Sequence, residues 1–176
     1  MRPSIHAVAL LPVFLAIFCC AAAAAEEKPT LLGNFRDWHV YSVGAGIDRL
    51  CYALSQPKEE TPKNLKRGAA SFLISSWPGR KVKNEPSVVP GYQYKVGSKT
   101  QVQVGSDKFD LFIKNDGANG GAWLEDPADE KRLIEALKRG SDMIVTGASS
   151  RGPLTRATYS LAGISAALDK VDGSCK

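Results

Sequence analysis

The chain has 176 residues, and 23 Lys and Arg against 18 Asp and Glu give a formal net charge of +5 at pH 7. This length suits one domain with a substantial hydrophobic core. The positive surplus is small and is not concentrated with aromatic residues, which argues against nucleic-acid binding and leaves anionic surfaces or acidic proteins as the partners that charge would favour.

The first 25 residues have the pattern of an export signal. Arg2 supplies a positive start, residues 7–20 form an almost unbroken apolar run, and residues 21–25 are small residues suited to cleavage. We predict a signal peptide at residues 1–25 and a mature domain at residues 26–176. The predicted location is the periplasm, with outer-membrane association or secretion as alternatives.

Two other interpretations of this N-terminal segment are less favoured. A membrane anchor would need about 20 apolar residues, and the run here is shorter. Acylation at Cys19 or Cys20 would make a lipoprotein, but the bulky Phe18 stands where a small residue is wanted. We therefore expect no transmembrane segment in the mature chain.

Two cysteines remain once the signal is removed, Cys51 and Cys175. Only one intramolecular pairing is open to them, and an oxidising compartment favours that bond. It would close a loop of 175 − 51 = 124 sequence steps, for which the chain-entropy model gives at most roughly 5 kcal/mol of stabilisation. A redox-active pair is the alternative, but the CxxC spacing is lacking. We predict a structural disulfide.

The first half of the mature domain alternates strands with turns. Residues 35–42 and 49–55 alternate bulky side chains at period 2, and residues 69–77 contain a continuous apolar run, so each predicts a strand. Between the second and third strands, residues 56–68 hold two prolines and mixed charge, which predicts a loop without regular pairing.

Basic residues gather in that loop and recur in a second predicted loop at residues 147–153. The candidate partner-binding residues are Lys58, Lys63, Lys66, Arg67 and Arg151. One interpretation is an anion-binding edge that faces lipopolysaccharide or an acidic protein. The alternative, which the sequence favours, is a solvated loop whose lysines protect a sheet edge.

The middle of the chain predicts a three-strand meander. The runs that alternate apolar and polar residues are 92–96, 102–104 and 109–113. Gly-Ser pairs at residues 97–98 and 105–106 separate these runs and suit type II′ hairpin turns, in which glycine supplies the positive φ. Residues 115–122 are rich in glycine and predict a wide turn.

Two helices complete the pattern. Asp126 as a cap, Pro127 in the first turn and a terminating Gly140 predict one mid-chain helix. The closing residues 159–175 carry an apolar stripe that predicts a C-terminal helix. With strands at residues 143–146 and 154–159, about eight short strands in all predict a mainly β fold, an antiparallel sandwich rather than a βαβ arrangement.

No set of residues typical of catalysis or metal binding is found. His39 is the one histidine of residues 26–176, with no nucleophile or orienting partner near it in the sequence. A zinc site therefore lacks ligands, and the 115–126 stretch departs from a calcium loop. Ser149 and Ser150 lack the GxSxG spacing of a hydrolase, which remains a remote alternative. We predict no catalytic residue, no metal and no cofactor.

Four stretches match a known family in their order and spacing. They are Phe35-Arg36-Asp37-Trp38, Cys51-Tyr52-Ala53-Leu54-Ser55, residues 146–152, and residues 159–168 with Cys175. With these the chain resembles the invasion-associated locus B family of secreted proteobacterial proteins. The resemblance implies an immunoglobulin-like β-sandwich in the periplasm or envelope and a link to invasion of host cells, erythrocytes especially. It supplies no enzymatic residues.

Three functions follow as hypotheses. The first is a non-catalytic binding or envelope-support protein, whose partner would be an envelope or host-surface protein or an anionic envelope component. The second is a secreted or surface virulence factor that promotes adhesion to host cells or their invasion, which rests on the resemblance alone. The third is the exported serine hydrolase. We expect a monomer or a weak dimer.

Overall fold

The computed structural model describes residues 27–117 and 119–176, so the predicted signal peptide lies outside the described residues. Eleven strands and two α helices are found in these ranges. The strands are β1 (Thr30–Phe35), β2 (Trp38–Val43), β3 (Leu50–Ser55), β4 (Glu59–Thr61), β5 (Ser71–Trp77), β6 (Val82–Val89), β7 (Thr100–Val104), β8 (Asp107–Asp116), β9 (Asn119–Trp123), β10 (Asp142–Ala148) and β11 (Leu154–Ser160). The helices are α1 (Pro127–Arg139) and α2 (Ile164–Ser174).

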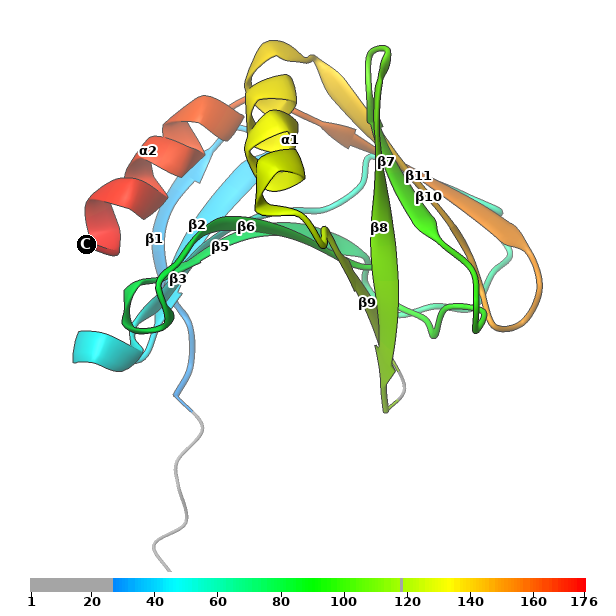
Figure 1. Ribbon diagram of the computed structural model, residues 1–176, viewed down its shortest axis with the longest axis horizontal. Coiled ribbons are helices and arrows are strands. Elements are labelled where there is room, and N and C mark those ends of the chain that lie inside the picture. The colour runs from blue at the N-terminus through cyan, green and yellow to red at the C-terminus, as the bar shows by residue number, and fades with distance from the viewer. Residues whose placement is uncertain (1–26, 118) are drawn as a thin grey trace, which may run out of the picture.

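The strands follow one another across the sheet in the order β1-β2-β3-β5-β6-β9-β8-β7-β10-β11-β4, and every pairing is antiparallel (Figure 1). β8 joins two half-sheets, because residues 107–111 pair with β7 and residues 112–116 pair with β9. We call the part from β1 to β9 the first half-sheet and the part from β7 to β4 the second. The predicted mainly antiparallel β fold with one mid-chain and one C-terminal helix is confirmed.

The core lies between the inner sides of the two half-sheets. Strict alternation along β2, β3 and β5 sends every second side chain inward, where Trp38, Phe72 and Ile74 are fully buried. Phe72 meets Tyr159 of the second half-sheet edge to face, with ring centroids 6.1 Å apart. Such an aromatic contact adds about 0.5–1.5 kcal/mol beyond the area it buries.

Both helices pack on this inner side. α1 begins as predicted, since the Ala128 amide donates to Asp126 Oδ1 at 2.8 Å and Pro127 takes the first turn. α2 lies against β1, β2 and β3 and forms the predicted disulfide, which joins Cys175 to the fully buried Cys51 with their Cα atoms 5.9 Å apart. None of the helices in the described ranges is long and apolar enough to cross a membrane.

The predicted meander is wrong in its first strand. The β7–β8 hairpin forms with Gly105 at φ +57°, but residues 92–96 make only a single bridge from Tyr94 to Ser149. The reason is a side chain: Asn115 accepts from the Tyr94 amide at 2.8 Å and donates to the Tyr94 carbonyl at 2.9 Å. These two bonds occupy the backbone groups that a neighbouring strand would use.

The third strand of the meander is β9, inside the stretch predicted as a wide turn. Its glycines are needed for packing, because a Cβ on Gly121 would lie 2.1 Å from the Trp123 ring and one on Gly120 would lie 2.7 Å from the Tyr94 ring. The Trp123 ring of the same strand and the Tyr94 ring fill the space beside these two glycines. The glycines therefore indicate close approach rather than a turn.

Three other expectations are corrected. The loop at residues 56–68 contains the short strand β4, which pairs with β11 at the edge of the sheet. β6 was not predicted, because it contains Pro86 and polar residues. The strand predicted at residues 35–42 is interrupted: Phe35 ends β1 and Trp38 begins β2, since Arg36 (φ +56°) and Asp37 form the turn between them.

Candidate binding groove

Four of the five candidate cations lie in two places, and Lys58 belongs to the first. Its ammonium pairs with the Asp37 carboxylate, and its backbone amide donates to the Thr158 carbonyl at 2.8 Å. The hydrogen bond from Lys58 is the main cause that lowers the pKa of Asp37, and a hydrogen bond from Ser160 adds to it. The charge of Lys58 is thus satisfied within the chain.

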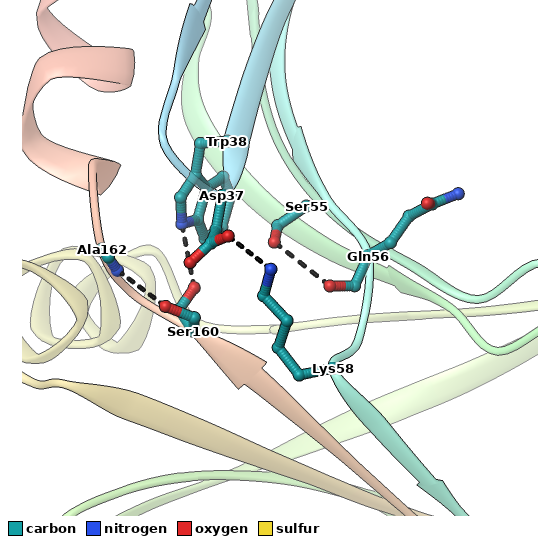
Figure 2. Close-up of polar contacts among 7 residues, drawn as sticks. All are labelled: Asp37, Trp38, Ser55, Gln56, Lys58, Ser160 and Ala162. Carbon is teal, nitrogen blue, oxygen red and sulfur yellow. Dashed lines mark hydrogen bonds and ion pairs between the residues drawn. The ribbon is translucent and has the colours of Figure 1, made fainter.

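Asp37 and Lys58 are part of a contact that ties the β1–β2 turn to the segment between β11 and α2 (Figure 2). Trp38 Nε1 donates to the Ser160 carbonyl at 3.1 Å, and the Ala162 amide donates to Ser160 Oγ at 3.2 Å. We call this contact the seam, made of Asp37, Trp38, Lys58 and residues 160–163. It fastens the first half-sheet to the second away from the β8 connection.

The seam explains two of the four family-like stretches in structural terms. The Asp37 amide donates to the Ala162 carbonyl at 3.3 Å, so the turn lies directly against the start of α2. Gly163 has φ +96°, and a Cβ there would stand 2.0 Å from the Phe35 carbonyl oxygen. The Phe35–Trp38 stretch and the 159–168 stretch therefore meet and hold each other.

Three other candidate cations converge on the second place. Lys66 and Arg67 come from the loop after β4, Arg151 comes from the loop between β10 and β11, and all three line one groove of about 570 Å³. Its other lining residues are Gly68, Gly91, Tyr92, Gln93, Asn119 and Ser150. We call it the basic groove. Lys63 is exposed and is not among these lining residues.

Backbone contacts bring the groove's loops together. Arg151 Nη1 donates to the Lys66 carbonyl at 3.2 Å, and the Gly68 amide donates to the Gly91 carbonyl at 2.8 Å. Gly91 has φ +76°, and a Cβ there would lie 2.2 Å from the Gly68 carbonyl oxygen. Glycine is required at this crossing because no side chain fits between the two loops.

Charge in the groove is unevenly satisfied. Arg67 has only 8 % of its side chain exposed; it donates to the Pro62 carbonyl at 2.9 Å, and its Nη1 lies 3.2 Å from Glu60 Oε1. Lys66 and Arg151 are exposed, and the lining residues include no carboxylate. The net positive charge open to solvent therefore comes from Lys66 and Arg151.

Tyr92 also lines the groove and is uncharged at neutral pH. Tyr92 Oη lies 2.5 Å from Thr155 Oγ1, and Thr155 donates to the Gly147 carbonyl at 3.1 Å, so the tyrosine is the donor to the threonine. Burial raises the pKa of Tyr92 above its ordinary value. Tyr92 therefore offers a neutral aromatic surface beside two cations.

A larger cleft of about 800 Å³ lies between α1 and β6. It is lined by lysines and carboxylates together, and Lys83 lies 3.9 Å from Asp172 within it. Glu130 faces Glu85 there, and burial together with that neighbouring charge raises the pKa of Glu130. Because its charges oppose one another, this cleft favours no single charge type.

The serine and histidine candidates are accounted for by local contacts. Ser149 is 1 % exposed, and its Oγ accepts from the Arg151 amide at 3.3 Å, so it stabilises the turn. His39 Nδ1 lies 2.6 Å from Asn34 Oδ1 on the β1–β2 hairpin. Among the described residues, no group of three or more His, Cys, Asp or Glu is placed to hold a metal ion.

Sequence reasoning missed part of the groove. Gln93 and Asn119 come from segments whose structure was predicted wrongly, and no sequence signal marks either as a groove residue. The side-chain amide of Gln93 donates a hydrogen bond to the Gly117 carbonyl, which brings the β8–β9 hairpin to the margin of the groove. The glycine-rich 115–122 stretch was the one available hint, and it was interpreted as a turn.

The fold and the groove define an antiparallel β-sandwich protein with a small basic groove between its loops. The family model of the Invasion associated locus B (IalB) protein matches residues 38–172, and the chain belongs to this family. It is also similar in fold to the crystal structure of invasion associated protein b from Bartonella henselae. That match has a TM-score of 0.56 and 15 % sequence identity, and it covers 80 % of this chain and 95 % of the other. No curated protein matches the chain.

Proposed function

We propose that the chain is a non-catalytic exported protein of the cell envelope whose basic groove binds an anionic group on an envelope component. The observation that carries this proposal is the convergence of Lys66 and Arg151, joined by the bond from Arg151 Nη1 to the Lys66 carbonyl at 3.2 Å. Two exposed cations from distant parts of the chain then face one groove that contains no carboxylate among its lining residues.

The groove has the chemistry of an anion site. The guanidinium of Arg151 keeps further N–H donors free beside its bond to Lys66, and a planar fork of donors suits phosphate and carboxylate oxygens. A volume of about 570 Å³ accommodates a group of small-molecule size. Tyr92 supplies an apolar wall against which the uncharged part of such a group packs.

Binding of an anionic probe tests the proposal directly. The probes are phosphate-bearing lipopolysaccharide and a polyglutamate peptide, which separate an envelope component from an acidic protein segment. We expect the wild type to bind lipopolysaccharide, and the Lys66→Ala/Arg151→Ala double variant to bind about tenfold more weakly or worse. Affinity should fall as salt rises, because screening weakens exposed charge pairs.

Lys63→Ala is the control, because it removes one positive charge from the same loop as Lys66 but outside the groove's lining residues. It should bind lipopolysaccharide as the wild type does. Equal binding by the wild type and the double variant would reject the groove as the site. Tighter binding of polyglutamate than of lipopolysaccharide would indicate that the partner is an acidic protein and not an anionic envelope component.

A second candidate function is adhesion to host cells or their invasion. It is favoured by the structural likeness to the invasion associated protein b of Bartonella henselae. A deletion strain distinguishes the two candidates when envelope integrity and entry into host cells are both measured. Loss of entry with an intact envelope would favour the second candidate, and the reverse result would favour the first.

The exported hydrolase is tested in the same strain. Complementation with a Ser149→Ala variant should restore the phenotype, because the Ser149 hydroxyl contacts only the Arg151 amide and has no chemical role in the proposed function. Ser150 is left intact because it lines the basic groove. A variant that folds but fails to complement would support the hypothesis of an exported serine hydrolase.

A further inference from the structure

The outward side of the first half-sheet is unusually apolar. Outward positions on β2, β3 and β5 alternate with the buried ones, and all of them are half-buried. The apolar residues at these positions are Tyr41, Val43, Leu50, Tyr52, Leu54, Leu73 and Trp77. We call this surface the outer apolar face. A sheet with one solvated side ordinarily carries polar residues there, so the pattern departs from the rule.

The second half-sheet follows that rule and serves as an internal comparison. Its outward positions are also half-buried or exposed, but they are mainly polar; they include Gln101, Gln103, Thr146, Arg156 and Thr158. Ile144 at the centre of this surface and the 81 % exposed Leu154 at the start of β11 are its apolar exceptions. We call this surface the outer polar face. The contrast shows that the apolar residues of the first half-sheet are not a general property of the chain.

No helix within residues 27–117 and 119–176 covers the outer apolar face. The disulfide to the inward Cys51 holds α2 on the opposite side of the same strands, and Figure 1 shows α1 and α2 on one side of this half-sheet. Tyr41 and Tyr52 stack on each other with ring centroids 5.5 Å apart. The face continues across β9 and β8, where Trp123 and the 46 % exposed Phe112 have ring centroids 6.0 Å apart.

We propose that the outer apolar face is a dimer interface that a second copy of this chain covers. Large exposed apolar surfaces on soluble proteins mark interaction sites. The outward positions of β2, β3 and β5 include no Lys, Arg, Asp or Glu, so two copies meet without like-charge repulsion. A two-fold axis makes such a surface its own complement, and two flat sheets pack face to face about 10 Å apart.

Charge also argues for a second copy over a charged partner. An anionic surface or a charged protein would find no counter-charge at the centre of this face and would leave its own charges desolvated. Charged residues stand at the margin instead, such as Lys114 on β8. A charge-poor centre with a polar rim is the usual composition of a protein–protein interface.

The available area is sufficient for a dimer. Six strands from β2 across to β8, at about 4.8 Å spacing, span about 24 Å, and six residues of strand extend about 20 Å. The projected area is therefore about 500 Å² per copy, or about 1,000 Å² for both, and the corrugation of the side chains adds to it. This reaches the lower limit of specific interfaces, about 1,000 Å² in total.

Mass measurement in solution tests the proposal. Sedimentation equilibrium of the purified chain should give twice the monomer mass at about 100 μM. Leu73→Glu places a carboxylate at the centre of the face, opposite Leu54 of β3. It should raise the dimer dissociation constant about 30-fold or more, the effect of losing an interface hot spot.

Ile144→Glu is the matched control, because it makes the same change at an outward, half-buried position of the other half-sheet. It should leave the dissociation constant unchanged. If Leu73→Glu does not fold, radical footprinting of the wild type replaces it, and Tyr52 should be protected more strongly at high protein concentration than at low. A monomer at all concentrations, or a dimer that Leu73→Glu and Ile144→Glu affect equally, would overturn the proposal.

Discussion

The seam and the basic groove draw cations from the same segment, residues 56–68, on either side of β4, but use them in opposite ways. Lys58 at the seam pairs with Asp37 and fastens one half-sheet to the other. Lys66 at the groove stays exposed, beside an Arg151 whose guanidinium bonds only to a backbone carbonyl. The same residue type therefore stabilises the fold in one place and remains free for a ligand in the other. The difference is that Lys58 has the Asp37 carboxylate within reach, whereas the residues lining the groove include no carboxylate.

The largest expected effect is the loss of the seam's buried aromatic. Trp38 is fully buried and meets Phe72 edge to face at 6.3 Å, so Trp38→Ala should lower the free energy of unfolding by about 3–5 kcal/mol. Trp38→Phe keeps most of the ring but loses the bond from Nε1 to the Ser160 carbonyl, and it should cost less. Urea unfolding measures both. Equal costs would show that the hydrogen bond, and not the packing, dominates the seam.

The next effect separates steric contact from backbone conformation. Gly163 at the seam and Gly152 in the groove's loop both have positive φ, +96° and +109°, but only Gly163 faces a nearby atom, the Phe35 carbonyl oxygen. Gly152→Ala should cost about 1 kcal/mol for conformation alone. Gly163→Ala should cost more, about 2–3 kcal/mol, since the chain must also shift. Similar thermal unfolding of the two variants would contradict the close packing at the seam.

The Asp37–Lys58 pair should make the seam pH-dependent. The folded-state pKa of Asp37 is lowered from 3.8, so its stabilisation is present above that value and is lost as pH falls through the lower folded-state pKa. Asp37→Asn should lower the free energy of unfolding by about 0.5–1 kcal/mol at pH 7, because the pair is exposed. The difference from the wild type should shrink in acid. A difference that is constant down to pH 2 would mean that the ion pair adds nothing.

Local signals made part of this architecture predictable. α1 was predicted at its observed start because its cap and its first-turn proline are neighbours in sequence, and the β7–β8 hairpin followed from a glycine at its turn. The disulfide followed from there being one cysteine pair in residues 26–176. The cap and the turn each depend on residues that are neighbours in sequence. The disulfide depends on distant residues, but residues 26–176 offer only one way to pair two cysteines.

The errors come from contacts between distant residues. Asn115 takes the backbone groups of Tyr94, 21 positions earlier, and so removes a strand whose alternation was clear. The groove shows the same limit. Lys66, Arg67 and Arg151 were candidates from their charge alone, but the contact that unites them joins Arg151 to Lys66 across 85 positions. Nothing in the local sequence predicts the contact between Arg151 and Lys66. Nor does it predict that Asp37 pairs with Lys58 and so satisfies its charge.

The smallest expected change in stability is at the groove. Lys66→Ala removes an exposed charge without a carboxylate partner, so the free energy of unfolding should stay within about 0.5 kcal/mol of the wild type. Lys58→Ala removes the same charge from the seam and should cost up to about 1 kcal/mol, while anion binding stays intact. Chemical unfolding and lipopolysaccharide titration of both variants then give opposite patterns. If Lys58→Ala weakened binding as much as Lys66→Ala, the cations of this loop would act through general charge, and the distinction between seam and groove would fail.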